Sequence, residues 1–142
     1  MKNDEILFGP QSLMFFELSP YYYCNFVVKG IRYRTIIHYW CTSYIENLKH
    51  NRDLTEMIRS ARTADMAMNM VKKWGFRDFN DLDPKEIILP IQERINQCDG
   101  IRNILMCTGE SYLRYRGVGY LAEDNKYGRI LMRIRDIYNE NK

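Results

Sequence analysis

Hydrophobic residues recur at helical spacing over residues 36–48. One row, with members four residues apart, holds Ile36, Trp40, Tyr44 and Leu48, and the adjacent row holds Ile37, Cys41 and Ile45. Two adjacent rows of this kind form a wide apolar stripe, which predicts a central helix that is buried over most of its surface. Thr35 precedes the stripe and can cap the helix, which we expect to run to about Lys49.

The hydrophobic pattern before this helix predicts a β-hairpin. Residues 21–28 are rich in aromatic and β-branched side chains, and residues 31–34 alternate apolar with basic ones. Lys29-Gly30 lies between them and fits a two-residue turn, because glycine readily adopts the positive φ that such a turn needs. Shorter apolar runs at residues 6–8 and 13–16 come before turn signals at Gly9-Pro10 and Ser19-Pro20.

Capping residues and apolar periodicity predict five further helices. We expect them to begin near Asp53, Thr63, Asp83, Ile101 and Asn125, with a late strand over residues 113–120. The apolar faces expected to be buried are Met66, Met70, Val71 and Trp74 in the second of these helices, Ile87, Ile88, Ile91 and Ile95 in the third, and Ile130, Leu131, Ile134, Ile137 and Tyr138 in the last. This order predicts an α+β fold: a single compact domain over residues 1–142, mostly α-helical, with a small mixed sheet.

Composition narrows the class of protein. The chain has 21 basic and 18 acidic residues, a net charge of +3, which is too small an excess to indicate nucleic-acid binding. No apolar run approaches the roughly 18 residues of a membrane span, and Met1–Glu5 is too polar for a signal peptide. The four cysteines are widely spaced and have no histidine cluster beside them, so we expect buried free thiols, no metal and no cofactor. We therefore expect an intracellular, cytoplasmic protein that is not secreted.

Two features are candidates for chemistry. His38 lies on the first turn of the central helix, where it is either a packed residue or a catalytic one. The turn Gly117-Val118-Gly119, followed by Glu123, Asp124 and Asn125, can direct backbone N–H groups toward an anion at the start of the last helix. The alternative is an ordinary glycine-bearing turn followed by a helix cap.

Five motifs, taken in order, resemble the NADAR (YbiA-like) family over most of the chain. After Phe8 in the opening strand, Leu18-Ser19-Pro20-Tyr21-Tyr22 is similar to the family's L-S-N-F-[YF], and residues 31–40 are similar to G-x-x-[YW]-P-[TS]-x-E-H-[YA]-[FW]. Thr108-Gly109 followed by Leu113 resembles T-G-x-x-x-L-[VI]-E. Gly117-Val118-Gly119 and residues 125–135 resemble the ending W-G-x-G…N-x-[LY]-G-x-[LI]-L-M-x-[VL]-R, which is the most specific match.

This resemblance implies an α+β fold that holds an ADP-ribose-like or other nucleotide-like ligand in a cleft. Family members hydrolyse N-glycosidic bonds, either removing ADP-ribose from guanine bases or cleaving early riboflavin-pathway intermediates. By the same resemblance, the ligand-binding positions are Arg116, Gly117, Gly119, Asn125 and Gly128.

The chain departs from the family where catalysis is expected. The family's glutamate falls on Ile37, and its lysine, further along the same helix, falls on Tyr44. The asparagine of L-S-N-F falls on Pro20, and the tryptophan of W-G-x-G falls on Arg116. Ile37 lies in the row of Cys41 and Ile45, which indicates that this edge of the helix is used for packing.

Three hypotheses follow. The first is a catalytically degenerate NADAR-like domain that serves as a structural or protein-interaction component of a larger assembly, for example a virion. The second is an active N-glycosidase that uses His38 with Glu123 or Asp124. The third is a sensor that binds ADP-ribose without turnover through Asn125, Arg116 and the glycine turn. A protein partner or an oligomeric assembly is expected in the first case, and a nucleotide ligand in the other two.

Overall fold

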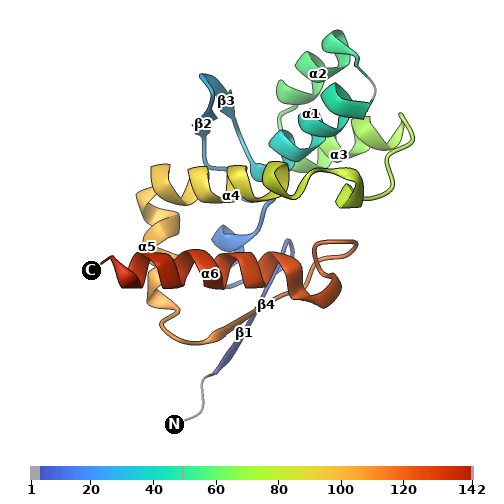
Figure 1. Ribbon diagram of the computed structural model, residues 1–142. Helices are drawn as coiled ribbons and strands as arrows, with labels where there is room; N and C mark the ends of the chain where they lie inside the picture. Colours follow the sequence, from blue (N-terminus) through green and yellow to red (C-terminus); the bar gives the residue numbers. More distant parts are fainter. Residues whose placement is uncertain (1–3, 49, 142) are drawn as a thin grey trace.

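Six α-helices and four short strands make up the part of the chain that the computed structural model describes, residues 4–48 and 50–141 (Figure 1). In chain order they are β1 (Glu5–Phe8), β2 (Phe26–Val28), β3 (Ile31–Tyr33), α1 (Ile36–Leu48), α2 (Arg52–Arg59), α3 (Ala64–Lys72), α4 (Pro84–Gln97), α5 (Asp99–Cys107), β4 (Tyr112–Tyr115) and α6 (Lys126–Glu140). The expected helix end at Lys49 and the chain ends Met1–Asn3 and Lys142 lie outside the described residues.

The strands form two separate ladders in place of one small mixed sheet. β1 pairs with β4 in parallel, from Glu5 opposite Tyr112 to Phe8 opposite Tyr115. β2 and β3 form the predicted antiparallel hairpin, and its turn residues Lys29 and Gly30 have φ values of 52° and 82°. Positive φ at both central residues is the geometry of a two-residue turn that follows the twist of the strands. The strands expected over residues 21–28 and 113–120 are shorter than predicted.

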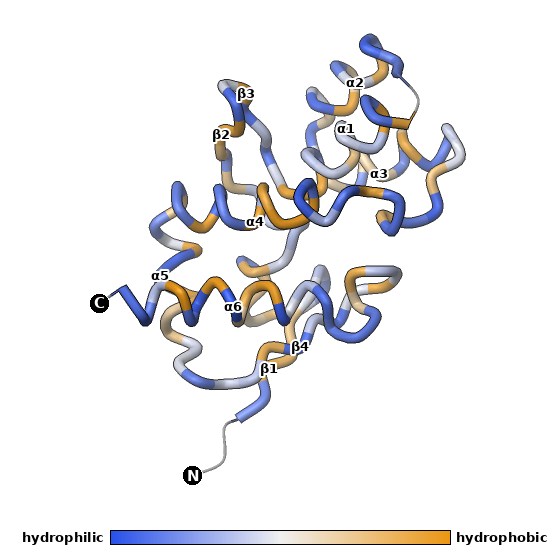
Figure 2. The backbone as a smooth tube through the Cα atoms, viewed as in Figure 1, coloured by the Kyte–Doolittle hydropathy of each residue, from blue (hydrophilic) through white to orange (hydrophobic). Residues whose placement is uncertain are grey.

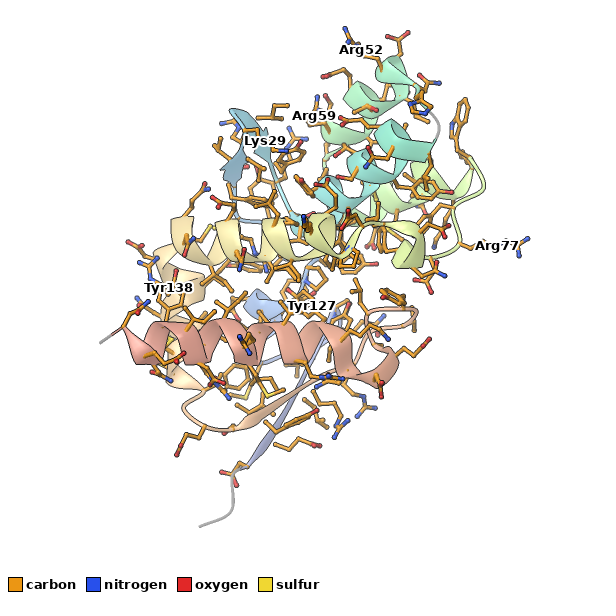
Figure 3. All side chains as sticks on the ribbon, viewed as in Figure 1. Lys29, Arg52, Arg59, Arg77, Tyr127 and Tyr138 are labelled. Atoms are coloured by element: carbon orange, nitrogen blue, oxygen red, sulfur yellow. The ribbon has the colours of Figure 1, made fainter. Side chains whose placement is uncertain are left out.

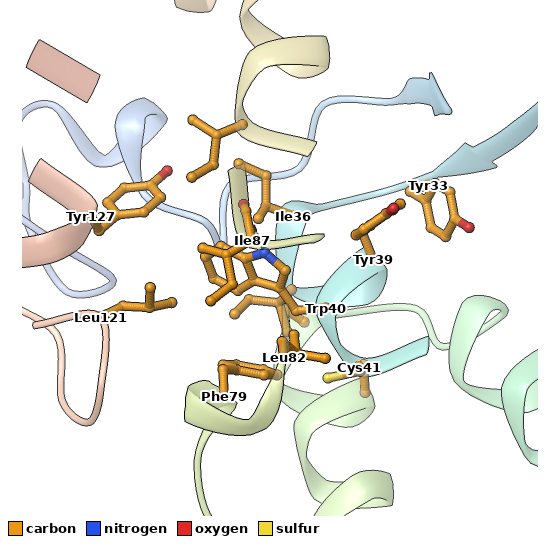
Figure 4. Close-up of a cluster of buried hydrophobic side chains, with 14 of the residues drawn as sticks. Tyr33, Ile36, Tyr39, Trp40, Cys41, Phe79, Leu82, Ile87, Leu121 and Tyr127 are labelled. Carbon is orange, nitrogen blue, oxygen red and sulfur yellow. Dashed lines mark hydrogen bonds between the residues drawn. The ribbon is translucent and has the colours of Figure 1, made fainter. Parts of the chain in front are cut away.

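Helix α1 is the centre of the core, as predicted. Its residues are buried without interruption from Ile36 to Ile45. Trp40 is 0% exposed, lies against the rings of Phe79 and Tyr127, and donates a hydrogen bond from Nε1 to the carbonyl of Ile87 at 3.1 Å (Figure 4). One indole therefore joins α1 to α4 and α6.

Two predictions about α2 and α3 were wrong. Asn51, rather than Asp53, caps α2, because its side chain accepts a hydrogen bond from the backbone N–H of Leu54 at 3.0 Å. Of the face predicted for α3, Val71 is buried, but Met66 is 43% exposed and Trp74, which follows the helix, is 45% exposed. Ala64 and Ala67 complete the buried face. Small side chains let α3 approach α1 closely, and Met68 and Met70 are half-buried against the core.

The predicted caps of α3 and α4 are confirmed. The Thr63 side chain accepts a hydrogen bond from the N–H of Met66 at the start of α3, and Asp83 accepts one from the N–H of Lys85 at the start of α4. Pro90 lies inside α4 and is buried. None of the described helices is long and apolar enough to cross a membrane.

Candidate functional site

His38 is enclosed at the start of α1, with both ring nitrogens occupied. Nε2 lies 2.8 Å from the carbonyl of Ala61, and Nδ1 lies 2.7 Å from the hydroxyl of Thr35. Because a carbonyl only accepts, Nε2 carries the proton and Nδ1 accepts from the Thr35 hydroxyl. The side chain is 0% exposed, and burial lowers the pKa of the imidazole. His38 is thus a neutral link between α1 and the end of α2.

The positions that the family resemblance assigns to a glutamate and a lysine are buried in packing contacts. Ile37 is 2% exposed and Tyr44 is 6% exposed, and Tyr44 packs edge-on against Phe76 with ring centroids 5.1 Å apart. Cys41 and Ile45, in the same row as Ile37, are 0% exposed. This edge of α1 presents apolar side chains to the core, as the sequence predicted.

The glycine turn after β4 is held by an aspartate that the sequence did not single out. Asp78 Oδ1 accepts hydrogen bonds from the backbone N–H of Tyr120 at 2.9 Å and from that of Phe79 at 2.8 Å. Gly117 lies flat on the ring of Tyr115, where a Cβ would be 2.3 Å from the ring carbons. Nothing near Asp78 in the sequence indicates this contact, because Tyr120 follows it by 42 positions.

Asn125 does not cap α6, contrary to the prediction. Its φ is 53° and its side chain makes no cap hydrogen bond. Instead Oδ1 accepts from the N–H of Tyr115 at 2.8 Å, and Nδ2 donates to the carbonyl of Leu113 at 2.8 Å and to the hydroxyl of Tyr112 at 3.1 Å. The Asn125 amide therefore pairs with the edge of β4 as another strand would.

Gly128 lies at the closest approach of α6 to β4. A Cβ at this position would lie 2.2 Å from the carbonyl oxygen of Leu113 and 2.5 Å from Oδ1 of Asn125. Gly128 and Asn125 together dock α6 on β4. Their predicted contact with a ligand stays a prediction.

The remaining candidate residues are on the surface. Glu123, Asp124 and Arg116 are exposed, and Glu123 lies 3.8 Å from the ammonium group of Lys126. Arg116 donates its backbone N–H to the carbonyl of Phe8, which continues the β1–β4 ladder. Within the described residues, no hydrogen bond or ion pair joins His38 to Glu123 or Asp124.

A cavity lies elsewhere, between α4 and α6. This α4–α6 groove has a volume of about 860 Å³. Its lining residues are Pro84, Ile87, Ile88 and Gln92 of α4, Tyr120 and Leu121 of the preceding loop, and Lys126, Arg129, Ile130, Met132, Arg133, Ile134, Asp136 and Ile137 of α6. A second cavity of about 530 Å³ lies between β3, the end of α1 and α2. None of the candidate catalytic or ligand-binding residues lines either cavity.

Ile137 was expected in the buried face of α6 but is 41% exposed on the α4–α6 groove. No group of three or more histidine, cysteine, aspartate or glutamate side chains among the described residues is placed to hold a metal ion.

Comparison with known proteins gives one informative result. No protein-family model matches the chain, and no curated protein sequence matches it. Among solved structures, the chain is similar to the NMR structure of the E. coli protein YbiA, with a TM-score of 0.81 over 99% of this chain and 88% of that chain. The protein has a YbiA-like fold. Sequence identity to YbiA is 18%, so the likeness establishes the architecture alone. The predicted α+β, mostly helical fold is confirmed.

Proposed function

We propose that this YbiA-like protein is a catalytically degenerate NADAR-like domain that acts as a structural or protein-interaction component. The observation that carries the proposal is Ile37, a buried apolar side chain where the family resemblance places a carboxylate. An isoleucine can neither accept nor relay a proton, and loss of general acid–base participation alone typically costs about 10²- to 10⁴-fold in rate.

The surroundings of Ile37 support the same conclusion. His38, the neighbouring candidate base, uses both ring nitrogens inside the protein. Tyr44 replaces the lysine that would capture an opened ribose, and a phenol cannot form an imine. Groups that act as a unit in catalysis are not replaced by those that remain. Glu123 and Asp124 are exposed and have no described hydrogen bond or ion pair to His38.

The proposal is tested by incubating the purified protein with an oligonucleotide that carries ADP-ribosyl-guanine and, separately, with a ribosylated riboflavin-pathway intermediate. We expect product release no faster than in the absence of protein, with an active NADAR enzyme as positive control. Turnover at enzymatic rates would overturn the proposal in favour of an N-glycosidase that uses His38 with Glu123 or Asp124.

A thermal-shift measurement with ADP-ribose addresses the sensor alternative. Millimolar ligand on a micromolar site adds roughly 4 kcal/mol to the stability of the folded state, which is readily detected. We expect no shift. Stabilisation without turnover would instead support a sensor that binds through Arg116, Asn125 and the glycine turn.

The double variant Ile37→Glu, Tyr44→Lys tests whether the protein has lost only the catalytic side chains or also the ligand cleft. Ile37→Gln, Tyr44→Lys is its control, since the amide has nearly the same shape but cannot transfer the proton. Activity in the first variant and not in the second would show that the cleft is retained. If both variants fold but are inactive, packed side chains have replaced the cleft.

A further inference from the structure

The α4–α6 groove presents apolar side chains that the fold leaves partly exposed. Its walls carry Ile88 of α4 and Ile130 and Ile137 of α6, and Ile137 is 41% exposed. Figure 2 shows hydrophobic segments on both helices where they run side by side. A cavity of this size with a largely apolar lining is a feature of binding sites, whereas single exposed apolar side chains are normal on a surface.

The charged side chains that line the groove are mostly basic. Lys126, Arg129 and Arg133 follow one another along α6 on the lining, and Asp136 is the acid among the lining residues. Lys126 also lies over the ring of Tyr120 at 4.5 Å. The α4 wall contributes no charged side chain to the lining. An occupant with acidic side chains on its flank therefore complements the α6 wall.

The walls also determine the backbone conformation of the occupant. α4 and α6 are both helices, so most of their backbone groups are paired within each helix, although Pro90 removes one donor from the hydrogen-bond ladder of α4. An extended peptide between them would leave its own N–H and C=O groups without partners, whereas a helix satisfies them internally. A third helix that lies along two others also packs its side-chain ridges into their grooves.

We propose that the α4–α6 groove binds an acidic amphipathic helix of a partner protein. The inference rests on the proposed interaction function and names its surface and its partner. Lys126 and Arg133 are seven residues apart, about 10.5 Å along the axis of α6. The partner helix is expected to carry acidic residues at i and i+7 beside an apolar stripe that covers Ile88, Ile130 and Ile137.

The test uses a capped peptide of about 18 residues, somewhat longer than the 15 residues of α6. It carries leucine at i, i+3, i+4 and i+7 spacing and glutamate on the flanks, and a matched peptide carries lysine in place of each glutamate. Fluorescence anisotropy with the full chain measures binding at low and high salt. We expect micromolar binding of the glutamate peptide, about tenfold weaker binding of the lysine peptide, and a loss of the difference at high salt.

Three exposed substitutions locate the site. Arg133→Glu should weaken the glutamate peptide about tenfold and strengthen the lysine peptide, and Ile137→Asp should abolish binding of both. Arg77→Glu is the matched control, because Arg77 is exposed and points away from α6 (Figure 3). It makes the same charge change outside the groove and should leave both affinities unchanged.

Several outcomes would overturn the inference. These are equal affinity for both peptides, equal effects of Arg133→Glu and Arg77→Glu, or no binding of the glutamate peptide. Self-association of the chain in sedimentation that Ile137→Asp abolishes would make a second copy the occupant. Turnover is assayed on the same preparation. Peptide binding accompanied by turnover overturns the proposed function alone, and absence of both binding and turnover overturns this inference alone.

Discussion

His38 shows how burial changes the meaning of a residue that is often catalytic. Because the folded-state pKa of His38 is lowered below its ordinary 6.5, the unfolded chain binds a proton in acid that the folded chain does not. Its contribution to stability is complete above pH 6.5 and is lost as the pH falls toward the lower folded-state pKa. Each pH unit in this window removes up to about 1.4 kcal/mol.

We therefore expect the urea midpoint of the wild type to decrease as the pH falls below 6.5. His38→Gln should flatten this dependence. His50→Gln is the control, since His50 is the only other histidine and is exposed, and it should keep the wild-type slope. An unchanged slope in His38→Gln would contradict the assignment.

Gly128 is required by a close approach between elements. Gly128→Ala would place a methyl group 2.2 Å from the Leu113 carbonyl, so we expect a loss of about 1–3 kcal/mol in the free energy of unfolding. Gly100 in α5 has open space where a Cβ would lie, with no atom within 4 Å, and Gly100→Ala should stabilise by up to about 1 kcal/mol. Urea denaturation gives the free energy of unfolding of both variants. Equal changes in that free energy would refute a steric role for Gly128.

At the scale of elements, α4 holds the segment before the hairpin through a buried arginine. Arg94 is 1% exposed and donates hydrogen bonds to the carbonyls of Tyr22 and Ser19, both at 2.9 Å. These bonds orient the segment that resembles the family motif L-S-N-F-[YF]. The sequence did not indicate this role, because an arginine in a helix is usually on its exposed face.

Arg94→Met should destabilise the fold by about 3 kcal/mol, since the carbonyls lose charge-assisted hydrogen bonds and remain buried. Arg62→Met, at an exposed arginine, should change stability by less than about 0.5 kcal/mol. Urea midpoints measure both variants. A similar midpoint for the two would show that the carbonyls find other partners.

A second long-range contact joins the segment before β2 to the junction of α4 and α5. The thiols of Cys24 and Cys98 lie in contact although the residues are 74 positions apart. Oxidised glutathione should link them, with two thiols oxidised to one disulfide and one glutathione disulfide reduced to two glutathiones. Reaction at neutral pH should be slow, because burial raises the pKa of Cys98 to about 12.

The disulfide closes a long loop and should raise stability by about 2–4 kcal/mol. Non-reducing peptide mapping identifies the link, and Cys24→Ser abolishes it. Cys107 is exposed, unlike the buried thiols expected from sequence, so Cys107→Ser serves as the matched variant that retains the Cys24–Cys98 link. A disulfide that formed equally in Cys24→Ser would disprove the pairing.

At the scale of the whole molecule, Tyr127 and Trp40 connect the first and last elements. Tyr127 on α6 donates its hydroxyl to the carbonyl of Leu18 at 2.6 Å and packs against Phe8 and against Trp40 (Figure 4). The N-terminal strand, the central helix and the C-terminal helix thus share one cluster. This arrangement supports the prediction of a single domain.

We expect residues 1–142 to unfold in one cooperative transition. Trp40 is buried and Trp74 is 45% exposed, so Trp74→Phe leaves a fluorescence signal from the core alone. Its urea transition should coincide with that of the far-ultraviolet circular dichroism, which reports the helices of the described residues together. Two separated transitions would indicate independently folding parts.

The sequence by itself determined the features that depend on near neighbours in the chain. These include the Lys29-Gly30 turn, the caps at Thr63 and Asp83, and the apolar stripe that buries α1 with Ile37 in it. Turns, caps and helical faces involve residues a few positions apart, so their spacing is visible in the sequence. The same local signals gave the order of the elements, and the family motifs implied which known fold that order forms.

Only the tertiary structure decided which surfaces meet. It paired β1 with β4, placed the Asn125 amide on β4 in place of a helix cap, and left Ile137 on an open groove. The local sequence around each of these two residues fits more than one outcome. An asparagine such as Asn125 can cap a helix or bond to a strand, and an isoleucine such as Ile137 can lie in the core or line a groove. Long-range packing selects among them, and this selection creates the surface on which the proposed partner binds.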